Sequence, residues 1–486
     1  MRNSLSFRTM LSFVILVLST VLPLSGAPAQ GQPLLDNPEV NTAIAVFDSW
    51  IQQRVIDQEL PGLSVGFVYD QELIWAKGYG YADIAKKIPA TPATAYRIAS
   101  LTKLFTATAI LKLRDEGKLQ LDDPMSKYVP WFHLKDDYGD SPVITLRHLL
   151  THTSGLPREL NGLYWDDMDF PDHDKFVQML QEASTILPRE TEYKYSNVAF
   201  AALGDVVSSM SGESYPDYVK KHILVPLGMQ STEVLPSKDM PGLATGYKFR
   251  EAGKARIAEP YMDLKGMVSA GNMASTVEDL AKFLSLQFRT GRAGGTQILK
   301  GSTLAEMQRV QWLDTSWQSG HGLGWFVTRA EDRVSISHGG YVNGHTSSIS
   351  ASVPEKFGVI VLANADDAKP SAIAKQAWTI VAPVVKTATA SPDKPVIPDT
   401  SWEKLTGEYE WTDGSLSRVL IAKSELAIID PRSDNPWSNR DRLEPVSGLV
   451  FRLKGGDQKG ELVRFEADKS GRIVRMVWPG YAATKK

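Results

Sequence analysis

The pattern of apolar and polar positions divides the first 385 residues into strand-rich ends and a helical middle. Two apolar runs at residues 63–69 and 72–79, separated by Asp70-Gln71, predict a β-hairpin. Similar runs predict four later strands, at residues 324–328, 334–338, 347–353 and 357–363. Apolar residues at helical spacing predict helices at residues 42–58, 104–116, 144–152, 176–183, 198–210 and 277–286. This order predicts an α+β domain, in which both ends share one antiparallel sheet flanked by helices and the middle forms a helical lobe.

The last 90 or so residues have a different pattern. Three prolines with Ser, Thr and Asp at residues 387–400 predict a linker. Short apolar runs follow it, bounded by turn residues, at residues 405–411, 417–422, 426–429, 450–453, 462–467 and 473–478. These runs predict a separate small C-terminal β-barrel domain at residues 401–486.

The extreme N-terminus has the composition of a secretory signal. Arg2 and Arg8 precede an apolar stretch at residues 10–24, and Ala27-Pro28-Ala29 provides small residues for cleavage. The alternative is a membrane anchor, but the apolar stretch is short and Pro23 interrupts it. We therefore expect residues 1–29 to be a cleaved signal peptide, the mature protein to be periplasmic or secreted, and no stable membrane anchor to remain.

Composition narrows the partners more than the fold. The 486 residues carry a formal net charge of −3, with acidic and basic residues mixed throughout. The sequence has no basic stripe, so nucleic acid is not an expected partner. It has no cysteine, so neither a disulfide nor a cysteine-linked lipid can form. The oligomeric state does not follow from these numbers.

The strongest chemical signal is Ser100-Leu101-Thr102-Lys103. These residues precede the predicted helix 104–116, which ends at Gly117, so Ser100 and Lys103 would share one face near the positive helix end. A serine hydroxyl needs a base to become a nucleophile, and a desolvated, partly neutral Lys103 amine would serve. The bland alternative is a capping serine beside a surface lysine. Ser-x-x-Lys also occurs at residues 391–394 and 401–404, without this helical context.

Two later motifs give the Ser100 motif its meaning: Tyr195-Ser196-Asn197 and His338-Gly339-Gly340. In this order the three motifs resemble those of the β-lactamase-related serine hydrolases, which include class C β-lactamases, D-alanyl-D-alanine carboxypeptidases and related esterases. The resemblance covers about residues 40–385, and the C-terminal domain resembles a lipocalin-like module. The resemblance to these serine hydrolases implies a β-lactamase/transpeptidase-like fold for a hydrolase domain at residues 30–386. A rival triplet, Tyr341-Val342-Asn343, directly follows the glycine motif, which favours Tyr195 as the family tyrosine.

The resemblance also implies roles for individual residues. Ser100 would form an acyl-enzyme, with Lys103 and Tyr195 as proton-transfer partners. We expect a Lys103 cation to lower the pKa of the Tyr195 phenol, which is normally near 10. The backbone N–H groups of Ser100 and Tyr341 would form the oxyanion hole, and substrate would lie against Asn197, His338, Gly339 and Gly340. The resemblance implies no metal and no cofactor, and the expected substrate is a small ester, amide or peptide.

His338 departs from the lysine that most β-lactamases carry at this position. A largely neutral histidine holds a substrate carboxylate weakly, so the departure favours esters over β-lactams or D-peptides. Whether the enzyme acts as a carboxylesterase, β-lactamase or D-amino-acid peptidase stays open at this stage.

Three features of the sequence are compatible with other functions. The protein could accept an acyl group without efficient turnover, as a penicillin-binding sensor does. Gly62-Leu63-Ser64-Val65-Gly66 matches the Gly-x-Ser-x-Gly motif, but a strand follows Ser64 where that motif needs a helix. His148 and His152 have metal-ligand spacing without an evident third ligand.

Overall fold

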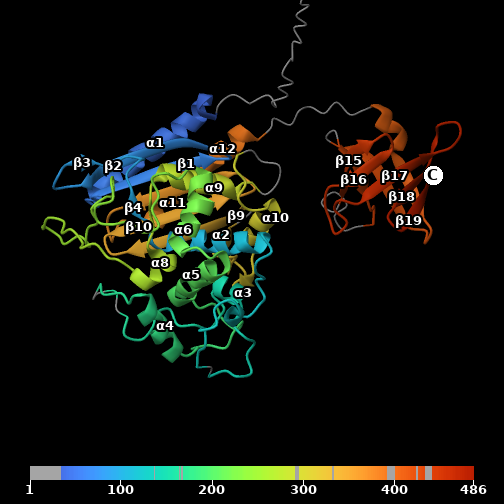
Figure 1. Ribbon diagram of the computed structural model, residues 1–486. Coiled ribbons are helices and arrows are strands. Elements are labelled where there is room, and N and C mark those ends of the chain that lie inside the picture. Colours follow the sequence, from blue (N-terminus) through green and yellow to red (C-terminus); the bar gives the residue numbers. More distant parts are fainter. Residues whose placement is uncertain are drawn as a thin grey trace, which may run out of the picture. The chain divides into compact units, whose positions relative to one another are not determined.

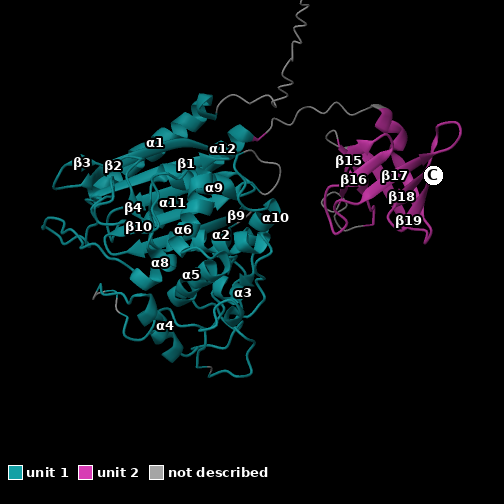
Figure 2. Ribbon diagram, in the orientation of Figure 1, with its two compact units in different colours: residues 1–389 teal, residues 390–486 magenta. Residues whose placement is uncertain are grey.

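The computed structural model of the protein describes residues 34–486 except residues 136, 164, 166–167, 290–294, 331–332, 391–399, 423–424 and 433–439. The signal peptide predicted at residues 1–29 and most of the linker predicted at 387–400 lie outside the described residues. Contacts divide the chain into two compact units, residues 1–389 and residues 390–486, which Figure 2 colours separately. No helix in the described part of the chain is long and apolar enough to span a membrane.

A nine-stranded antiparallel sheet forms the centre of the first unit (Figure 1). Its strands are β1 (Gly62–Tyr69), β2 (Glu72–Asp83), β3 (Ile88–Pro89), β6 (Trp312–Leu313), β7 (Ser319–His321), β8 (Phe326–Ala330), β9 (Arg333–Val342), β10 (His345–Ser352) and β11 (Phe357–Ala363). Their order is β3-β2-β1-β11-β10-β9-β8-β7-β6, so the N-terminal hairpin joins the C-terminal strands. The predicted sharing of one sheet between the two ends of the domain is confirmed.

Helices cover both faces of this sheet. Helices α1 (Pro38–Asp57), α11 (Pro370–Ile380) and α12 (Ala382–Thr389) lie on one face, and α9 (Val277–Gln287) packs against β1, β2 and β11 on the other. Alternate residues of β11 enter the two cores: Val359 and Val361 contact the first helices, and Ile360 and Leu362 face α9. Burial on both faces explains why β11 is apolar throughout.

The helical lobe is built around α2 (Thr102–Asp115), which contacts α5 (Asn197–Ser211) and α8 (Val268–Gly271). Nearly every residue of α2 through Leu113 is buried, so its apolar residues surround the axis instead of forming one stripe. The other helices of this unit are α3 (Leu146–Leu150), α4 (His173–Glu182), α6 (Tyr215–Val219), α7 (Val225–Leu227) and α10 (Gly301–Gln308). The lobe beside the antiparallel sheet confirms the expected α+β class.

The second unit is a closed eight-stranded antiparallel barrel. Its strands are β12 (Gly407–Trp411), β13 (Leu416–Ala422), β14 (Glu425–Ile429), β15 (Asp441–Ser447), β16 (Val450–Leu453), β17 (Leu462–Ala467), β18 (Ile473–Trp478) and β19 (Tyr481–Lys485). The predicted small C-terminal barrel is therefore confirmed, with two strands that the pattern missed. β15 contains Pro445, and β19 is short and mostly small or polar, so neither has a strong strand signal.

Candidate active site

Ser100 lies at a strained turn between a short strand and a buried helix. Strand β4 (Tyr96–Arg97) pairs with β5 (Ala274–Ser275), and a single 3-10 turn at Ala99–Leu101 leads into α2. Ala99 has φ of 48°, a conformation that a residue with a Cβ rarely adopts. The pattern predicted Ser100 at the first turn of the helix, and the structure places it in the 3-10 turn just before α2. Ser100 is half-buried there and remains open to a small ligand.

Lys103 brings its amine to the Ser100 hydroxyl. It is one turn into α2 and has no exposed surface. Its Nζ lies 3.1 Å from Ser100 Oγ, 2.7 Å from Asn197 Oδ1 and 2.6 Å from the carbonyl oxygen of Ala270. No ion pair among the described residues includes Lys103. Hydrogen bonds therefore hold the amine from three sides, and the rings of Tyr195 and Phe200 lie beside it.

Asn197 reaches Lys103 because α5 begins beside it. Ser196 caps this helix with its side-chain oxygen, accepting the N–H of Ala199, so Asn197 is the first helical residue. The Asn197 Nδ2 group donates to Glu159 Oε1, which also accepts the indole N–H of Trp165 at 3.0 Å. Because a carboxylate accepts only, it fixes the amide with Oδ1 toward Lys103. Glu159 thus orients the group that binds the lysine.

The three hydrogen-bond partners of Lys103 determine where the lone pair of its neutral amine points. Asn197 Oδ1 and the Ala270 carbonyl are acceptors only, and a neutral amine has two N–H groups and one lone pair. If the two N–H groups go to these acceptors, the lone pair is left for the Ser100 O–H. The arrangement therefore directs the basic electron pair of the lysine at the serine proton.

The electrostatic surroundings favour that neutral form. Burial lowers the pKa of Lys103 from 10.5 to about 7, since it removes the ammonium from water. The negative charge of Glu159 opposes this shift, and the positive charge of Arg158 adds to it. Near neutral pH a substantial fraction of Lys103 can then accept a proton.

Tyr195 lies over the same group, but its pKa shifts against expectation. Its ring centroid is 5.0 Å from Lys103 Nζ and 5.3 Å from the guanidinium carbon of Arg158. Burial nevertheless raises the pKa of Tyr195 to about 12, although interactions with Ser100 and Arg158 oppose the rise. The prediction that a Lys103 cation would lower this pKa is therefore wrong, because the loss of hydration on burial raises it. In the free protein Tyr195 is a phenol that can donate a proton.

His338 faces this cluster from β9 as a neutral side chain. It is only 3% exposed, and burial lowers its pKa to about 3, with Lys103 and His321 adding to the effect. Its Nδ1 lies 2.7 Å from the Gly339 carbonyl, an acceptor, so Nδ1 carries the proton. His338 Nε2 is then an acceptor without a partner in the described structure. His338 cannot serve as a cationic clamp at neutral pH.

The two glycines after His338 differ in what surrounds them. A Cβ on Gly340 would meet the Ile98 carbonyl oxygen and Ser347 Oγ, each at 2.3 Å, whereas a Cβ on Gly339 would meet nothing closer than 3.7 Å. Gly340 therefore lets β9 pack against the backbone that leads to Ser100. Tyr341 follows at the edge of a cavity, with its side chain 48% exposed.

This cavity beside Ser100 is narrow. Its volume of about 10 Å³ is roughly one water-sized sphere. Apolar side chains and both predicted oxyanion residues line it: Ala99, Ser100, Trp165, Asn197, Leu264, Met267, Ala270, Gly271, Tyr341 and Val342. The structure thus brings Ser100, Lys103, Tyr195, Asn197, His338 and Tyr341 into one region, as the motif order implied.

Comparison with known proteins shows which family the chain belongs to. A family model described as "Beta-lactamase" matches residues 47–382. The chain belongs to the beta-lactamase family. It is 27% identical over 461 residues to "Beta-lactamase-like protein 2" of Dictyostelium discoideum, covering 90% of this chain and 83% of that protein. It is 31% identical over 326 residues to "Protein flp" of Staphylococcus aureus (strain MW2), covering 65% of this chain and 62% of that protein.

Two solved structures share the fold of this beta-lactamase family member. The octameric penicillin-binding protein homologue from Pyrococcus abyssi matches with a TM-score of 0.62 and 24% identity, covering 91% of this chain and all of that one. EstCE1, described as a hydrolase with promiscuous acyltransferase activity, matches with a TM-score of 0.59 and 22% identity. The second match covers 72% of this chain and 99% of that one.

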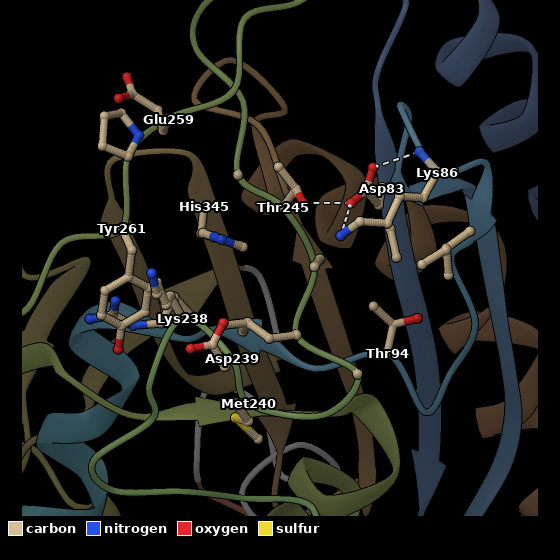
Figure 3. A pocket seen from close by; sticks show the side chains of 18 of the residues that line it. Asp83, Lys86, Thr94, Lys238, Asp239, Met240, Thr245, Glu259, Tyr261 and His345 are labelled. Carbon is tan, nitrogen blue, oxygen red and sulfur yellow. Dashed lines mark hydrogen bonds and ion pairs between the residues drawn. The ribbon is translucent and has the colours of Figure 1, made fainter.

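A much larger cavity of about 800 Å³ lies elsewhere in this beta-lactamase domain (Figure 3), and Ser100 is not among its lining residues. Tyr261, His345 and Glu259 line it, together with Asp83, whose carboxylate bonds Lys86 and Thr245. Its size alone does not make it the reaction centre, because it offers no nucleophile paired with a base.

Arg97, three residues before Ser100, lines this large cavity. Its guanidinium donates to the Met262 carbonyl at 2.6 Å and to Asn272 Oδ1 at 2.9 Å, and it lies over the Tyr261 ring. Asn272 closes the helix α8 that supplies the Ala270 carbonyl to Lys103. Arg97 therefore ties the segment before Ser100 to the segment that holds the lysine.

The structure also places the alternative site residues. Ser64 is fully buried in β1, and its hydroxyl is bonded to the Thr91 carbonyl and to Tyr96 Oη, so it is a structural residue. His148 Nε2 contacts Glu190, and His152 Nδ1 accepts the N–H of Ser196. No group of three potential metal ligands occurs among the described residues.

Sequence reasoning missed Glu159, Arg158 and Ala270. Arg158 and Glu159 stand in a loop, and Ala270 contributes only its backbone. A charged pair in a loop is ordinarily a solvated surface, so nothing in one sequence distinguishes it. Trp165 also lines the cavity beside Ser100.

Proposed function

We propose that this protein is a serine hydrolase that forms an acyl-enzyme on Ser100. The observation that carries the proposal is the buried Lys103 amine, 3.1 Å from Ser100 Oγ, with its pKa lowered to about 7 and its other two contacts made by acceptors. Few structural roles require an unpaired buried lysine, whose charge is costly to desolvate. The same desolvation that disfavours the ammonium leaves a neutral amine, which can accept the Ser100 proton.

The proposed reaction has two stages. Lys103 takes the Ser100 proton as Oγ attacks the carbonyl carbon, and the N–H groups of Ser100 and Tyr341 stabilise the oxyanion. The bond to the leaving alcohol or amine then breaks. That group takes the proton from Lys103, directly or through the Tyr195 phenol. Water then attacks the acyl carbon while Lys103 takes its proton, the bond from the acyl carbon to Ser100 Oγ breaks to release the acid, and the Lys103 ammonium returns the proton to Ser100 Oγ.

The proposed substrates are esters of small acids. The cavity beside Ser100 is narrow and mostly apolar, so it suits a short acyl chain. His338 is neutral, so a substrate carboxylate finds no cation at this position. Because EstCE1 is described as a hydrolase with acyltransferase activity, alcohols deserve testing as acyl acceptors beside water.

The test combines a substrate panel with covalent labelling. We expect p-nitrophenyl acetate to be hydrolysed faster than the butyrate, and both faster than a cephalosporin or a D-alanyl amide. Mass spectrometry after a fluorophosphonate inhibitor should find the label on Ser100. Ser100→Ala should lower turnover by at least about 10³-fold, while Ser64→Ala keeps it. A label on another residue contradicts the proposal, and a burst without steady state would instead indicate an acyl-accepting sensor.

We also propose that the protein is exported and acts in the periplasm or outside the cell. The support is the N-terminal sequence, with its charged, apolar and small-residue regions. N-terminal sequencing of protein isolated from a secretory host should begin at residue 30. A mature chain that retains Met1 in the membrane fraction would contradict cleavage.

A further inference from the structure

The C-terminal barrel holds a cavity that the proposed hydrolysis does not use. One end of the barrel is closed by the 3-10 segment η6 (Thr400–Leu405), whose Trp402 and Leu405 enter the barrel core. Tyr409 Oη, in β12, donates to the Leu405 carbonyl at 2.7 Å and fixes this segment. Toward the opposite end lies a cavity of about 450 Å³, bordered by the last inward residues of several strands. We call this cavity the barrel cup.

The strand register explains which side chains enter the barrel cup. Side chains alternate between the two faces of a strand, so a residue two places from a core residue also points inward. Trp411 is two residues from buried Tyr409, and Trp478 is two residues from buried Met476. By the same rule Asp441, two residues before buried Leu443, and Tyr481, two residues before buried Ala483, also point inward. All four line the barrel cup.

The two tryptophans of the barrel cup offer ring faces rather than polar edges. Their centroids lie 6.2 Å apart with the rings inclined at 69°. The Trp411 indole N–H donates to Ser417 Oγ at 2.9 Å, and the Trp478 indole N–H donates to Gln458 Oε1. Both donors are therefore used within the protein, and what remains for a ligand is π surface.

The charged residues of the barrel cup are all acidic. Asp413, Asp430 and Asp441 line it, and no lysine or arginine is among its lining residues. Burial raises the pKa of Asp441, and no cation among its neighbours offsets that effect. Hydrogen bonds from Ser415, and to a lesser extent the charge of Arg432, lower the pKa of Asp413, and the backbone N–H of Arg432 donates to Asp430. For the Asp441 carboxylate, no hydrogen bond or ion pair with another described residue is found, and burial is the cause of its shift.

We propose that the barrel cup binds an organic cation, an alkylated or protonated ammonium carried on an apolar body. Aromatic faces attract such cations, and the partly buried Asp441 carboxylate supplies the matching charge. The volume exceeds that of a simple ammonium ion, which leaves room for the apolar body against Ile428 and the rings. The site belongs to the barrel and acts independently of Ser100.

The experiment measures binding to the full-length protein by calorimetry and ligand-observed NMR. The probes are benzyltrimethylammonium, choline and 3,3-dimethylbutan-1-ol, which is the uncharged counterpart of choline. We expect the two cations to bind and the alcohol to bind at least tenfold more weakly. Ser100→Ala should bind them as the parent does. Equal binding of choline and the alcohol, or no binding of either cation at 10 mM, overturns the proposal.

Two substitutions on β15 locate the site. Asp441→Asn removes the inward charge and should weaken benzyltrimethylammonium binding at least fivefold. Glu444→Gln removes the same charge from an exposed residue of the same strand and should change binding less than twofold. Trp478→Leu tests the aromatic face and should also weaken binding, with thermal melting to verify folding. Equal effects of Asp441→Asn and Glu444→Gln would indicate only a long-range field and overturn the assigned site.

Discussion

Among single residues, burial rather than pairing sets the chemistry of the candidate site. Lys103 and Tyr195 have shifts of opposite sign for the same reason: each group is driven toward its uncharged form. The result is a neutral Lys103 amine and a neutral Tyr195 phenol, both close to the Ser100 hydroxyl. Proton transfer among neutral groups avoids creating an isolated charge until the substrate carbonyl receives one.

The first prediction concerns pH. Because the neutral Lys103 amine is the active form, kcat/KM for p-nitrophenyl acetate should rise with pH through about 7 and then level off. His338 and His321 have pKa values lowered to about 3 and about 4, so neither titrates in that range. A stopped-flow profile from pH 5 to 9 checks this. Activity that is highest at pH 5 would rule out Lys103 as the base.

The second prediction uses two neighbouring charges of opposite sign. Arg158 lowers the pKa of Lys103 and Glu159 raises it. Arg158→Gln should therefore move the acid limb of the kcat/KM profile to higher pH, and Glu159→Gln should move it to lower pH. Both variants place the same amide in the loop, so each serves as control for the other. Shifts in the same direction would show a structural disturbance instead.

A third prediction separates the orienting role of Glu159 from its charge. Glu159→Gln retains an oxygen that accepts from Asn197 Nδ2, whereas Glu159→Leu removes it. We expect Glu159→Leu to lower kcat at least tenfold below Glu159→Gln, because the Asn197 amide can then turn away from Lys103. Similar kcat values for the two variants would show that the carboxylate acts through charge alone.

The sequence predicted which residues form the site better than it predicted their protonation states. Spacing and order selected Ser100, Lys103 and Asn197, which the structure brings together. The pKa direction of Tyr195 was wrong, because a motif indicates a nearby cation but not the depth of burial. Glu159 was invisible because its importance arises from Asn197, a residue 38 positions away in the chain.

Among elements, the decisive contact is that of β9 with the turn before Ser100. Gly340 lets the strand approach the Ile98 carbonyl, and Ser347 Oγ on β10 donates to that same carbonyl at 2.9 Å. The turn continues through Ala99 at φ of 48°, which surrounding contacts must maintain. The sheet therefore holds the nucleophile in place through its backbone.

The fourth prediction follows from this contact. Gly340→Ala would place a Cβ 2.3 Å from the Ile98 carbonyl oxygen, so the backbone must shift. We expect a loss of about 1–3 kcal/mol in the free energy of unfolding, as for overpacked cores, and slower labelling of Ser100. Gly339→Ala has space and should change stability by less than about 0.5 kcal/mol. Chemical denaturation measures both, and equal losses would contradict the packing argument.

The longer elements of the sheet and lobe mostly followed from the pattern, but short ones did not: α6 was missed although Ser214 caps it and a proline lies in its first turn. Longer helices with side-chain caps, such as α5 after Ser196 and α9 after Thr276, were predicted within a few residues. The missed α11 follows Lys369, which adopts a left-handed conformation and provides no side-chain cap. Such a start is set by the tertiary fold, since α11 covers β10 and β11.

For the whole molecule, the two units have separate cores. The apolar clusters of the hydrolase unit end at Val385 and its neighbours, and the barrel cluster begins at Trp402. All predicted site residues belong to the first unit. The pattern indicated this separation through the proline-rich stretch, although most of the predicted linker lies outside the described residues.

The fifth prediction tests this separation. A chain ending at Thr389 should fold and hydrolyse p-nitrophenyl acetate within about twofold of the full-length rate, because no side chain of the proposed mechanism is lost. Circular dichroism and thermal melting verify the fold. Loss of activity from a folded truncated chain would show that the barrel contributes to the reaction.

The enclosure of Lys103 has a practical outcome for handling the enzyme. Solvent does not reach this amine, so reagents that acylate or alkylate accessible amines at neutral pH will modify the exterior lysines and spare it. Coupling to an amine-reactive resin should then yield an immobilised catalyst that retains its turnover.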